Sequence, residues 1–176
     1  PQAPLTIACG WKGNAPDLST PLQVVGRAGC DRNPLDARSE KTVERLLSYV
    51  WADQTERMER LAAALGSVAR SGLRIEKADA GEWAQERLAR PQPAGRARVL
   101  FHTVVRQYLS AQTEARLAAA IARAGEVATI GRPFAHLAFE WDGRKPGGAL
   151  RLTLWPDGTE RFLARADYHG RWVDWA

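Results

Sequence analysis

The sequence predicts an α/β protein with three layers: a mostly parallel sheet, helices on both of its faces, and an antiparallel hairpin near the C-terminus. Three observations lead to this prediction. Residues Val99–Phe101 form a continuous apolar run, the pattern of a strand that is buried on both faces. Strand-like and helix-like segments alternate through the chain. The turn sequence Pro156–Gly158 separates the last two long strand-like segments.

Length and composition are those of a globular protein. The 176 residues suit one domain, and we expect a single α/β domain over residues 1–176. Hydrophobic residues make up 45% of the chain, but no apolar run approaches the roughly 20 residues that a membrane-spanning helix needs. Two cysteines do not make a disulfide framework, so we expect reduced thiols and a cytoplasmic location. Because the chain begins with Pro1 rather than Met, we interpret it as the C-terminal portion of a longer protein.

The net charge of +5 permits binding to anions, including nucleic acid. The arginines are spread along the chain, however, and no block of five or six basic residues occurs. A small-molecule ligand is therefore the partner that we expect, with nucleic acid as a less supported alternative. If an upstream strand is missing, the exposed strand edge could pair with another chain, so a homo-oligomer is also predicted.

The first half of the chain predicts short strands followed by two helices. Strands are expected at residues 5–9 and 22–25, and a turn-rich segment follows at residues 27–36. Ser39 can cap the first helix, and Asp53 with Glu56 resembles the capping box that begins a second helix. The apolar positions of the two helices are Val43, Leu46, Leu47, Val50, Met58, Leu61, Leu65 and Val68. Gly72 is expected to end the second helix.

The second half predicts the main sheet. Residues 73–78 alternate as a strand does, and Asp79 then caps a helix that ends before Pro91. The apolar run at 99–101 is the central strand, and Ser110 can cap the helix that follows it. Three further strands are expected at residues 134–141, 149–155 and 161–166.

Polar residues follow two of the predicted strands. Strands joined through a helix lie parallel, and their carboxyl ends then meet at one edge of the sheet. We therefore expect Asp79, His102 and Thr103 to face a common crevice, which Asp31 joins if residues 22–25 belong to the same sheet. Imidazole is a general base near neutral pH, so His102 is the candidate catalytic residue.

Each of these residues also has an ordinary structural explanation. Asp79 can be an N-cap that needs no ligand, and Asp31 can form an Asx turn. His102 can be a buried histidine that is bonded to the backbone. A separate hypothesis joins Asp167, His169 and Thr103 as a hydrolase site, but the chain has no Gly-x-Ser-x-Gly nucleophile turn.

Four segments resemble an uncharacterised bacterial family, domain of unknown function 2332, and together they span nearly the whole chain. They are Gly29–Asp36, Val50–Gln54, Phe101–Leu109 and Asp167–Trp172. An open α/β sheet that ends in a hairpin also resembles the Rossmann-like fold of class I S-adenosylmethionine-dependent methyltransferases. Members of the bacterial family are longer, and their upstream half carries a loop that looks like a methyltransferase cofactor loop. This chain contains no Gly-x-Gly-x-x-Gly motif.

The resemblance implies S-adenosylmethionine as the cofactor. It places Asp79 against the adenine amino group, with Asp31 and Thr103 as further cofactor-binding residues, and His102 as the base that deprotonates the methyl acceptor. The sequence therefore carries two hypotheses of function. One is a methyltransferase-like enzyme whose cofactor loop lies upstream of this chain. The alternative is a non-catalytic α/β module that binds a ligand or another protein.

Overall fold

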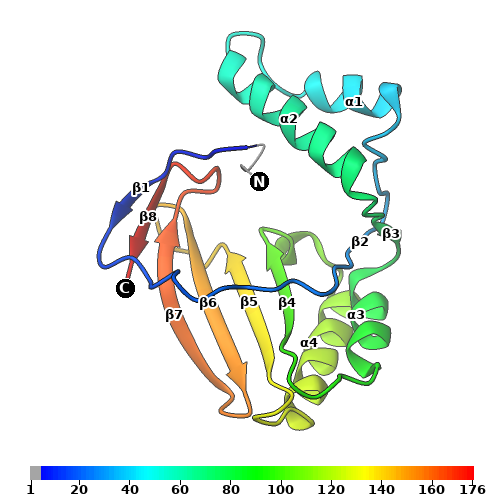
Figure 1. The fold of residues 1–176 in the computed structure, drawn as a ribbon, viewed down its shortest axis with the longest axis vertical. Coiled ribbons are helices and arrows are strands. Elements are labelled where there is room, and N and C mark those ends of the chain that lie inside the picture. The colour runs from blue at the N-terminus through cyan, green and yellow to red at the C-terminus, as the bar shows by residue number, and fades with distance from the viewer. Residues whose placement is uncertain (1–4) are drawn as a thin grey trace. The chain divides into compact units, whose positions relative to one another are not determined.

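The computed structural model describes residues 5–176, which form two compact units. One unit comprises residues 5–7 and 22–78, and the other comprises residues 8–21 and 79–176 (Figure 1). The single domain expected from the chain length stays a prediction. No helix among the described residues is long and apolar enough to cross a membrane.

The first unit is built on a pair of helices, α1 (Glu40–Leu47) and α2 (Thr55–Ser71), which pack against each other. Both were expected from the helical spacing of their apolar residues. Gly72 adopts the left-handed conformation, with φ of 70°, and ends α2 as predicted, because glycine has no Cβ to oppose that conformation.

Two short strands of the first unit form a sheet of their own. They are β2 (Cys30–Asp31) and β3 (Glu76–Lys77), which pair in parallel. The prediction that residues 73–78 belong to the main sheet is therefore wrong. The strands predicted at residues 5–9 and 22–25 are not formed either. Leu22, Val24 and Val25 are exposed, which shows that a short apolar run without a pairing partner does not make a strand.

The second unit holds a six-stranded sheet in the order β1-β8-β7-β6-β5-β4 (Figure 1). The strands are β1 (Gly10–Lys12), β4 (Arg98–Thr103), β5 (Phe134–Glu140), β6 (Gly148–Trp155), β7 (Thr159–Ala166) and β8 (Trp172–Trp175). The β6–β7 hairpin turns at Pro156–Gly158, as predicted.

The sheet is mixed, so the mostly parallel, Rossmann-like arrangement is not confirmed. β4 pairs in parallel with β5, and β1 with β8, whereas the pairs β5–β6, β6–β7 and β7–β8 are antiparallel. The reason lies in the connections. A parallel pair needs a long crossover, which a helix supplies between β4 and β5, while short links join β5 to β6 and β6 to β7.

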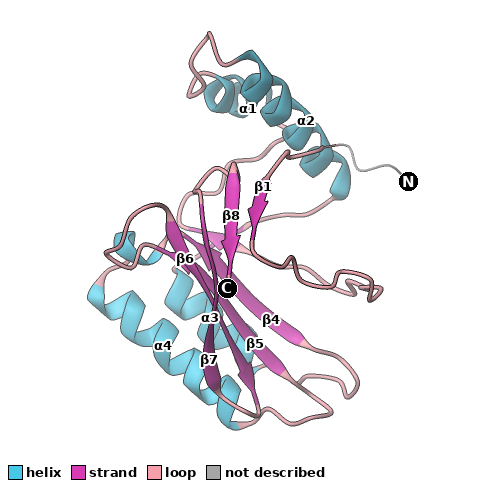
Figure 2. Ribbon diagram, turned by 90° about the vertical axis from the view of Figure 1, so that its left-hand side faces the viewer, coloured by secondary structure: helices cyan, strands magenta, loops and turns pink. Residues whose placement is uncertain are grey.

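Both helices of this unit lie on the same face of the sheet (Figure 2). They are α3 (Ala80–Ala89) and α4 (Ala111–Glu126), the second preceded by a short 3₁₀ helix, η1 (Arg106–Tyr108). The buried core joins them to β5 through Ala84, Leu88, Leu117, Ala120, Ala124 and Phe134. Within the described residues of this unit, helices thus cover one face of the sheet and not the two that were predicted.

Because α3 and α4 cover one face of the sheet, the side chains on the other face of β4 are exposed. Leu100 packs against the core, while its neighbours Val99 and Phe101 are 57% and 70% exposed. The prediction of a strand buried on both faces is therefore wrong. β4 is an edge strand of the sheet, and its side chains alternate between the helix-covered face and the opposite one.

Candidate functional site

A carboxylate and two imidazoles form a hydrogen-bonded chain at the carboxyl end of the parallel pair β4–β5. Nδ1 of His102 lies 2.6 Å from Oε1 of Glu140, and its Nε2 lies 2.9 Å from Nε2 of His136. The side chains of His102 and Glu140 are only 10% and 17% exposed. We call this arrangement the Glu–His–His chain. It joins two strands through side chains that share the helix-covered face of the sheet.

The backbone after β4 turns so that it also binds Glu140. Val104 has φ of +50°, a left-handed conformation that is strained for a β-branched residue. Directly after it, the backbone N–H groups of Val105 and Arg106 donate to Oε1 of Glu140, at 3.1 and 3.4 Å. Because N–H groups can only donate, Glu140 serves this turn as an acceptor, and a carboxylate is the form that accepts best.

The protons of the Glu–His–His chain are assigned from these bonds. Glu140 accepts from Nδ1–H of His102, and in the arrangement that we assign, the Nε2 lone pair of His102 accepts from Nε2–H of His136. Burial lowers the pKa of His136 to about 4, with further lowering by the nearby His102 and Arg106, so His136 is neutral at neutral pH. Its Nδ1 atom then carries a lone pair and has no hydrogen-bond partner among the described residues.

His136 and Glu140, two members of the Glu–His–His chain, line a pocket of about 270 Å³. We call it the β5–β6 pocket. Its other lining residues are Arg106, Ala138, Trp141, Asp142, Ala149, Arg151, Thr153 and Glu160. Both of its guanidinium groups are paired, because Arg106 binds Glu114 and Arg151 lies 3.0 Å from Glu160. The pocket therefore offers positive and negative groups side by side.

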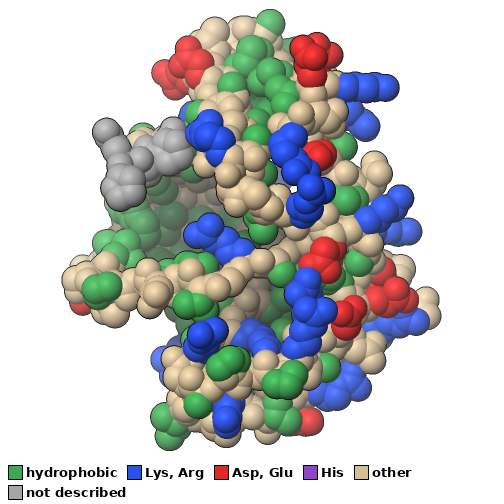
Figure 3. Space-filling view, turned by 45° about the vertical axis from the view of Figure 1, so that its right-hand side comes forward, with side chains coloured by type: hydrophobic (Ala, Val, Ile, Leu, Met, Phe, Trp, Pro, Cys, Tyr) green, Lys and Arg blue, Asp and Glu red, His purple; other side chains and the backbone are tan. Residues whose placement is uncertain are grey.

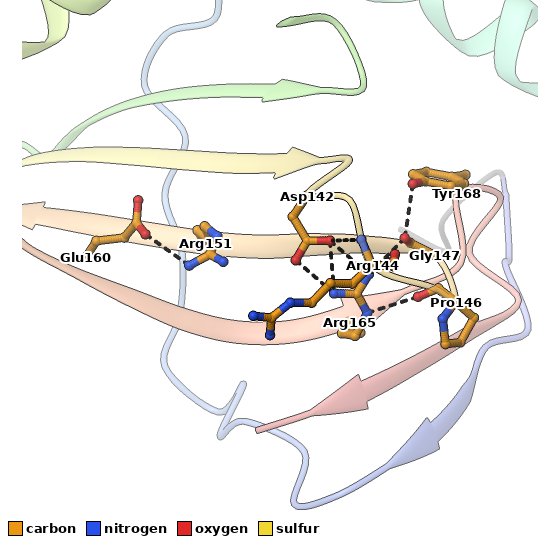
Figure 4. A network of polar contacts seen from close by, with 8 residues as sticks. All are labelled: Asp142, Arg144, Pro146, Gly147, Arg151, Glu160, Arg165 and Tyr168. Atoms are coloured by element: carbon orange, nitrogen blue, oxygen red, sulfur yellow. Dashed lines mark hydrogen bonds and ion pairs between the residues drawn. The ribbon is translucent and has the colours of Figure 1, made fainter. Parts of the chain in front are cut away.

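One wall of the β5–β6 pocket is held by a guanidinium clamp (Figure 4). Arg165 on β7 binds the carboxylate of Asp142, with Nη1 2.9 Å from Oδ2, and donates to the backbone carbonyls of Arg144, Pro146 and Gly147. Tyr168 adds a hydroxyl bond of 3.0 Å to the carbonyl of Gly147. The guanidinium bond also lowers the pKa of Asp142. The loop between β5 and β6 is thus fixed through its backbone as well as its side chains.

Asp79, predicted to bind a cofactor, is the N-cap of α3. Its Oδ1 accepts from the backbone of Gly81 and Glu82, at 2.9 and 3.3 Å, and its Oδ2 accepts the hydroxyl of Thr113 at 2.6 Å. The Thr113 bond is the main reason that the pKa of Asp79 is lowered. Both carboxylate oxygens therefore serve the joint between α3 and α4.

The other predicted cofactor residues do not lie with His102. Thr103 follows His102 on β4, so its exposed side chain is on the opposite face of the strand. Asp31 belongs to the first unit, where its Oδ1 accepts the backbone N–H of Asn33 at 2.7 Å in an Asx-type turn. Their cofactor roles stay predictions, but these residues do not line the β5–β6 pocket.

The side chains of Asp167 and His169 do not form the carboxylate–imidazole hydrogen bond that the hydrolase hypothesis requires. Asp167 binds the guanidinium of Arg171, with Nη2 3.0 Å from Oδ1, and this contact lowers the pKa of Asp167 to about 2. Toward His169 it accepts only the backbone N–H, at 2.9 Å.

The sequence analysis found His102 but missed His136, Glu140 and the strained Val104. A signal was present in the strand Phe-Ala-His-Leu-Ala-Phe-Glu, where His136 and Glu140 fall on the same face because side chains alternate with a period of two. Finding their partner requires the parallel register in which Leu100 lies beside His136 and His102 beside Ala138.

Charged side chains of both signs occur on the surface. On the face drawn in Figure 3, lysine and arginine side chains are dispersed among acidic and apolar ones and form no continuous basic stripe. Within residues 5–176, no group of three or more His, Cys, Asp or Glu side chains is arranged to hold a metal ion.

Comparison with known proteins identifies one family. The model of a family described as an uncharacterized protein conserved in bacteria, DUF2332, matches residues 1–175. No curated protein and no solved structure matches the chain at a significant level.

Proposed function

Since the chain belongs to the DUF2332 family of bacterial proteins, we propose that the Glu–His–His chain is the acid–base centre of an enzyme acting on a small polar molecule. The observation that supports this most is the continuous path from the Glu140 carboxylate through His102 to His136, which lines the β5–β6 pocket. This arrangement connects a carboxylate and two imidazoles to a pocket, which is the geometry that proton transfer to or from a bound molecule requires.

The proposed proton movement balances over three groups. Nδ1 of His136 takes a proton from the bound substrate, and its Nε2–H proton passes 2.9 Å to Nε2 of His102. His102 then carries both ring protons, and the positive charge lies beside Glu140 rather than on His136. With a pKa of about 4, His136 is by itself a weak base. The relay makes it effective, because the positive charge moves to His102 and does not stay on His136.

The pocket favours a substrate with both charges. Arg106 and Arg151 have N–H donors beyond those that bind Glu114 and Glu160 and can share them with an anionic group, while Glu140, Asp142 and Glu160 can receive hydrogen-bond donors. A volume of about 270 Å³ lies near the lower end of small-molecule sites. A small zwitterionic molecule, such as an amino acid or an amino alcohol phosphate, combines these properties.

The test is a proton NMR survey of pools of such molecules in deuterated buffer, which detects both conversion and deuterium uptake at carbon. We expect the wild-type chain to convert one class and His136→Gln to lose about 10²–10⁴-fold of that rate. The matched control is His169→Gln, which changes an exposed histidine remote from the Glu–His–His chain in sequence. Saturable binding without any conversion would instead support the non-catalytic binding module.

Methyl transfer from S-adenosylmethionine is the narrower second proposal. The base at His136 supports it, because a methyl acceptor must lose a proton, and so does the resemblance given above. Asp79, Thr103 and Asp31 do not come together at the β5–β6 pocket, so no step of the relay depends on this cofactor. Calorimetric titration with S-adenosylmethionine tests it. Saturable binding whose affinity Asp79→Asn lowers would support the assignment, and an affinity that is the same in wild type and Asp79→Asn would refute it.

A further inference from the structure

We infer that a second pocket of the sheet unit binds a small amphipathic anion, a molecule with an apolar body and one carboxylate or phosphate head. This pocket lies at the amino ends of β4 and β5, where Arg98 and Phe134 begin the two strands. The Glu–His–His chain lies toward their carboxyl ends. We call the second site the arginine pocket.

The floor of the arginine pocket is apolar. Its volume is about 330 Å³, and its apolar lining comprises Leu88, Ala89, Pro91, Ala120, Ala124, Val127, Ala128 and Phe134. Four of these residues, Leu88, Ala120, Ala124 and Phe134, belong to the buried core, so the floor is rigid and pre-formed. Such a surface gains free energy by covering a hydrocarbon or aromatic group.

The polar part of the lining is strongly cationic. It consists of Arg90, Arg98, Arg123 and Arg132 with Gln85 and Gln92, and it contains no aspartate or glutamate. Arg90 is neutralised by Glu86. The other three arginines have no carboxylate partner among the described residues, so their charges are uncompensated at the pocket.

Two of these arginines are held in place by backbone carbonyls. The guanidinium of Arg98 donates to the carbonyl oxygens of Leu88 and Arg90, at 2.8 and 2.9 Å, and burial lowers its pKa. Arg132 donates through Nε to the carbonyl of Gln92, at 2.9 Å. Carbonyl oxygens orient a guanidinium without cancelling its net charge, which leaves the group attractive to an anion.

Arg123 completes the site as the adaptable member. It is exposed on the last turns of α4 and has no partner among the described residues, so it can swing onto a bound head group. An apolar floor with three uncompensated arginines fits an anion that has a body, whereas inorganic phosphate would leave the floor bare. A neutral apolar molecule would leave the guanidinium groups without a partner.

The experiment titrates the 176-residue chain with octanoate, octanol and acetate. Binding is measured by calorimetry and by the changes in amide NMR shifts. We expect saturable binding of octanoate with shifts at α3 and α4, and binding at least tenfold weaker for octanol and for acetate. Equal affinity for octanol would refute the role of the arginines. Absence of saturable octanoate binding up to about 10 mM would refute the site.

Variants separate the pocket from general surface charge. Arg123→Gln should weaken octanoate binding about fivefold, within the range of an exposed ion pair, and Gln85→Glu should weaken it by introducing a carboxylate of nearly the same shape. Arg60→Gln, an exposed arginine on α2 outside this unit, is the charge-matched control and should leave the affinity unchanged. The inference fails if Arg60→Gln lowers the affinity as much as Arg123→Gln does.

Discussion

The Nε2 atoms of His102 and His136 lie 2.9 Å apart, and the centroids of the two rings are separated by 5.0 Å. A contact of this kind needs one N–H and one lone pair, so both Nε2 atoms cannot be protonated while it persists. In the arrangement above, a proton added to His136 enters at Nδ1, so the Nε2–H···Nε2 contact can persist, and the cost of the added charge comes chiefly from the burial of the ring.

The stability of the chain should fall in weak acid through His136. Its pKa of about 4 in the folded protein is below the ordinary value of 6.5, so between these values the unfolded chain binds the extra proton. The stabilisation is complete above pH 6.5 and is lost as the pH falls toward 4. Its upper bound is about 3 kcal/mol, and solvent screening at a partly exposed ring reduces the expected loss to about 1 kcal/mol between pH 7.5 and pH 5.

Urea unfolding at pH 7.5 and pH 5 measures this effect. His136→Gln should lose less of its unfolding free energy than the wild type over that interval, and His169→Gln should behave as the wild type does. An identical pH dependence in wild type and His136→Gln would show that the ring titrates normally in the folded protein.

Glycine should be tolerated at Val104, where it would ordinarily be harmful. The φ of +50° strains a valine by about 1–3 kcal/mol, which glycine relieves, although it gives up the packing of a half-buried side chain and adds backbone entropy to the unfolded chain. We expect Val104→Gly to change the free energy of unfolding by less than about 1 kcal/mol. Val105→Gly, at a neighbouring residue with φ of −113°, is the control and should destabilise by more than about 1 kcal/mol. Equal losses in thermal or urea unfolding would contradict the strain.

Asp79→Ala should destabilise the chain by about 2 kcal/mol, because it removes an N-cap and leaves the Thr113 hydroxyl without its acceptor. Ser39→Ala is a matched comparison, since Ser39 is the N-cap of α1 but its side chain makes no capping bond. We expect that loss to be below about 0.5 kcal/mol. Comparable urea midpoints for the two variants would mean that the Asp79 bonds contribute little.

The two faces of β4 should respond differently to truncation. Leu100→Ala removes a side chain that packs on the core and should cost about 2–3 kcal/mol, whereas Phe101→Ala, at a side chain that is 70% exposed, should cost less than about 1 kcal/mol. Urea unfolding of the two variants decides the matter. A larger loss for Phe101→Ala would restore the interpretation of a strand buried on both faces.

Local signals predicted the elements better than their arrangement. The caps Asp79 and Ser110, the helix end at Gly72 and the hairpin at Pro156–Gly158 were all expected, because each depends on chemistry within a few residues. Strand direction was mispredicted in the main sheet, since the pairs β5–β6, β6–β7 and β7–β8 are antiparallel and an apolar run does not reveal which strand lies at an edge.

The candidate site shows the same limit. His102 was identified because it ends an apolar strand, whereas His136 and Glu140 meet it only through the register of β4 and β5. Thr103 was placed with His102 although adjacent strand residues point to opposite faces. The positive φ at Val104 has no sequence signal, because valine is disfavoured in that conformation and is held there by the surrounding bonds.

The clamp of Arg165 on the β5–β6 loop has a consequence for proteolysis. The bond between Arg144 and Lys145 is of the kind that trypsin cleaves, and it lies in a surface loop, the usual place for a nick. A protease must draw the residues around the cleaved bond into an extended form, but here the carbonyl of Arg144 and those of Pro146 and Gly147 are bonded to one guanidinium. The bond between Arg144 and Lys145 should therefore resist trypsin as long as Arg165 is present, so this arginine protects the loop from cleavage as well as shaping the pocket.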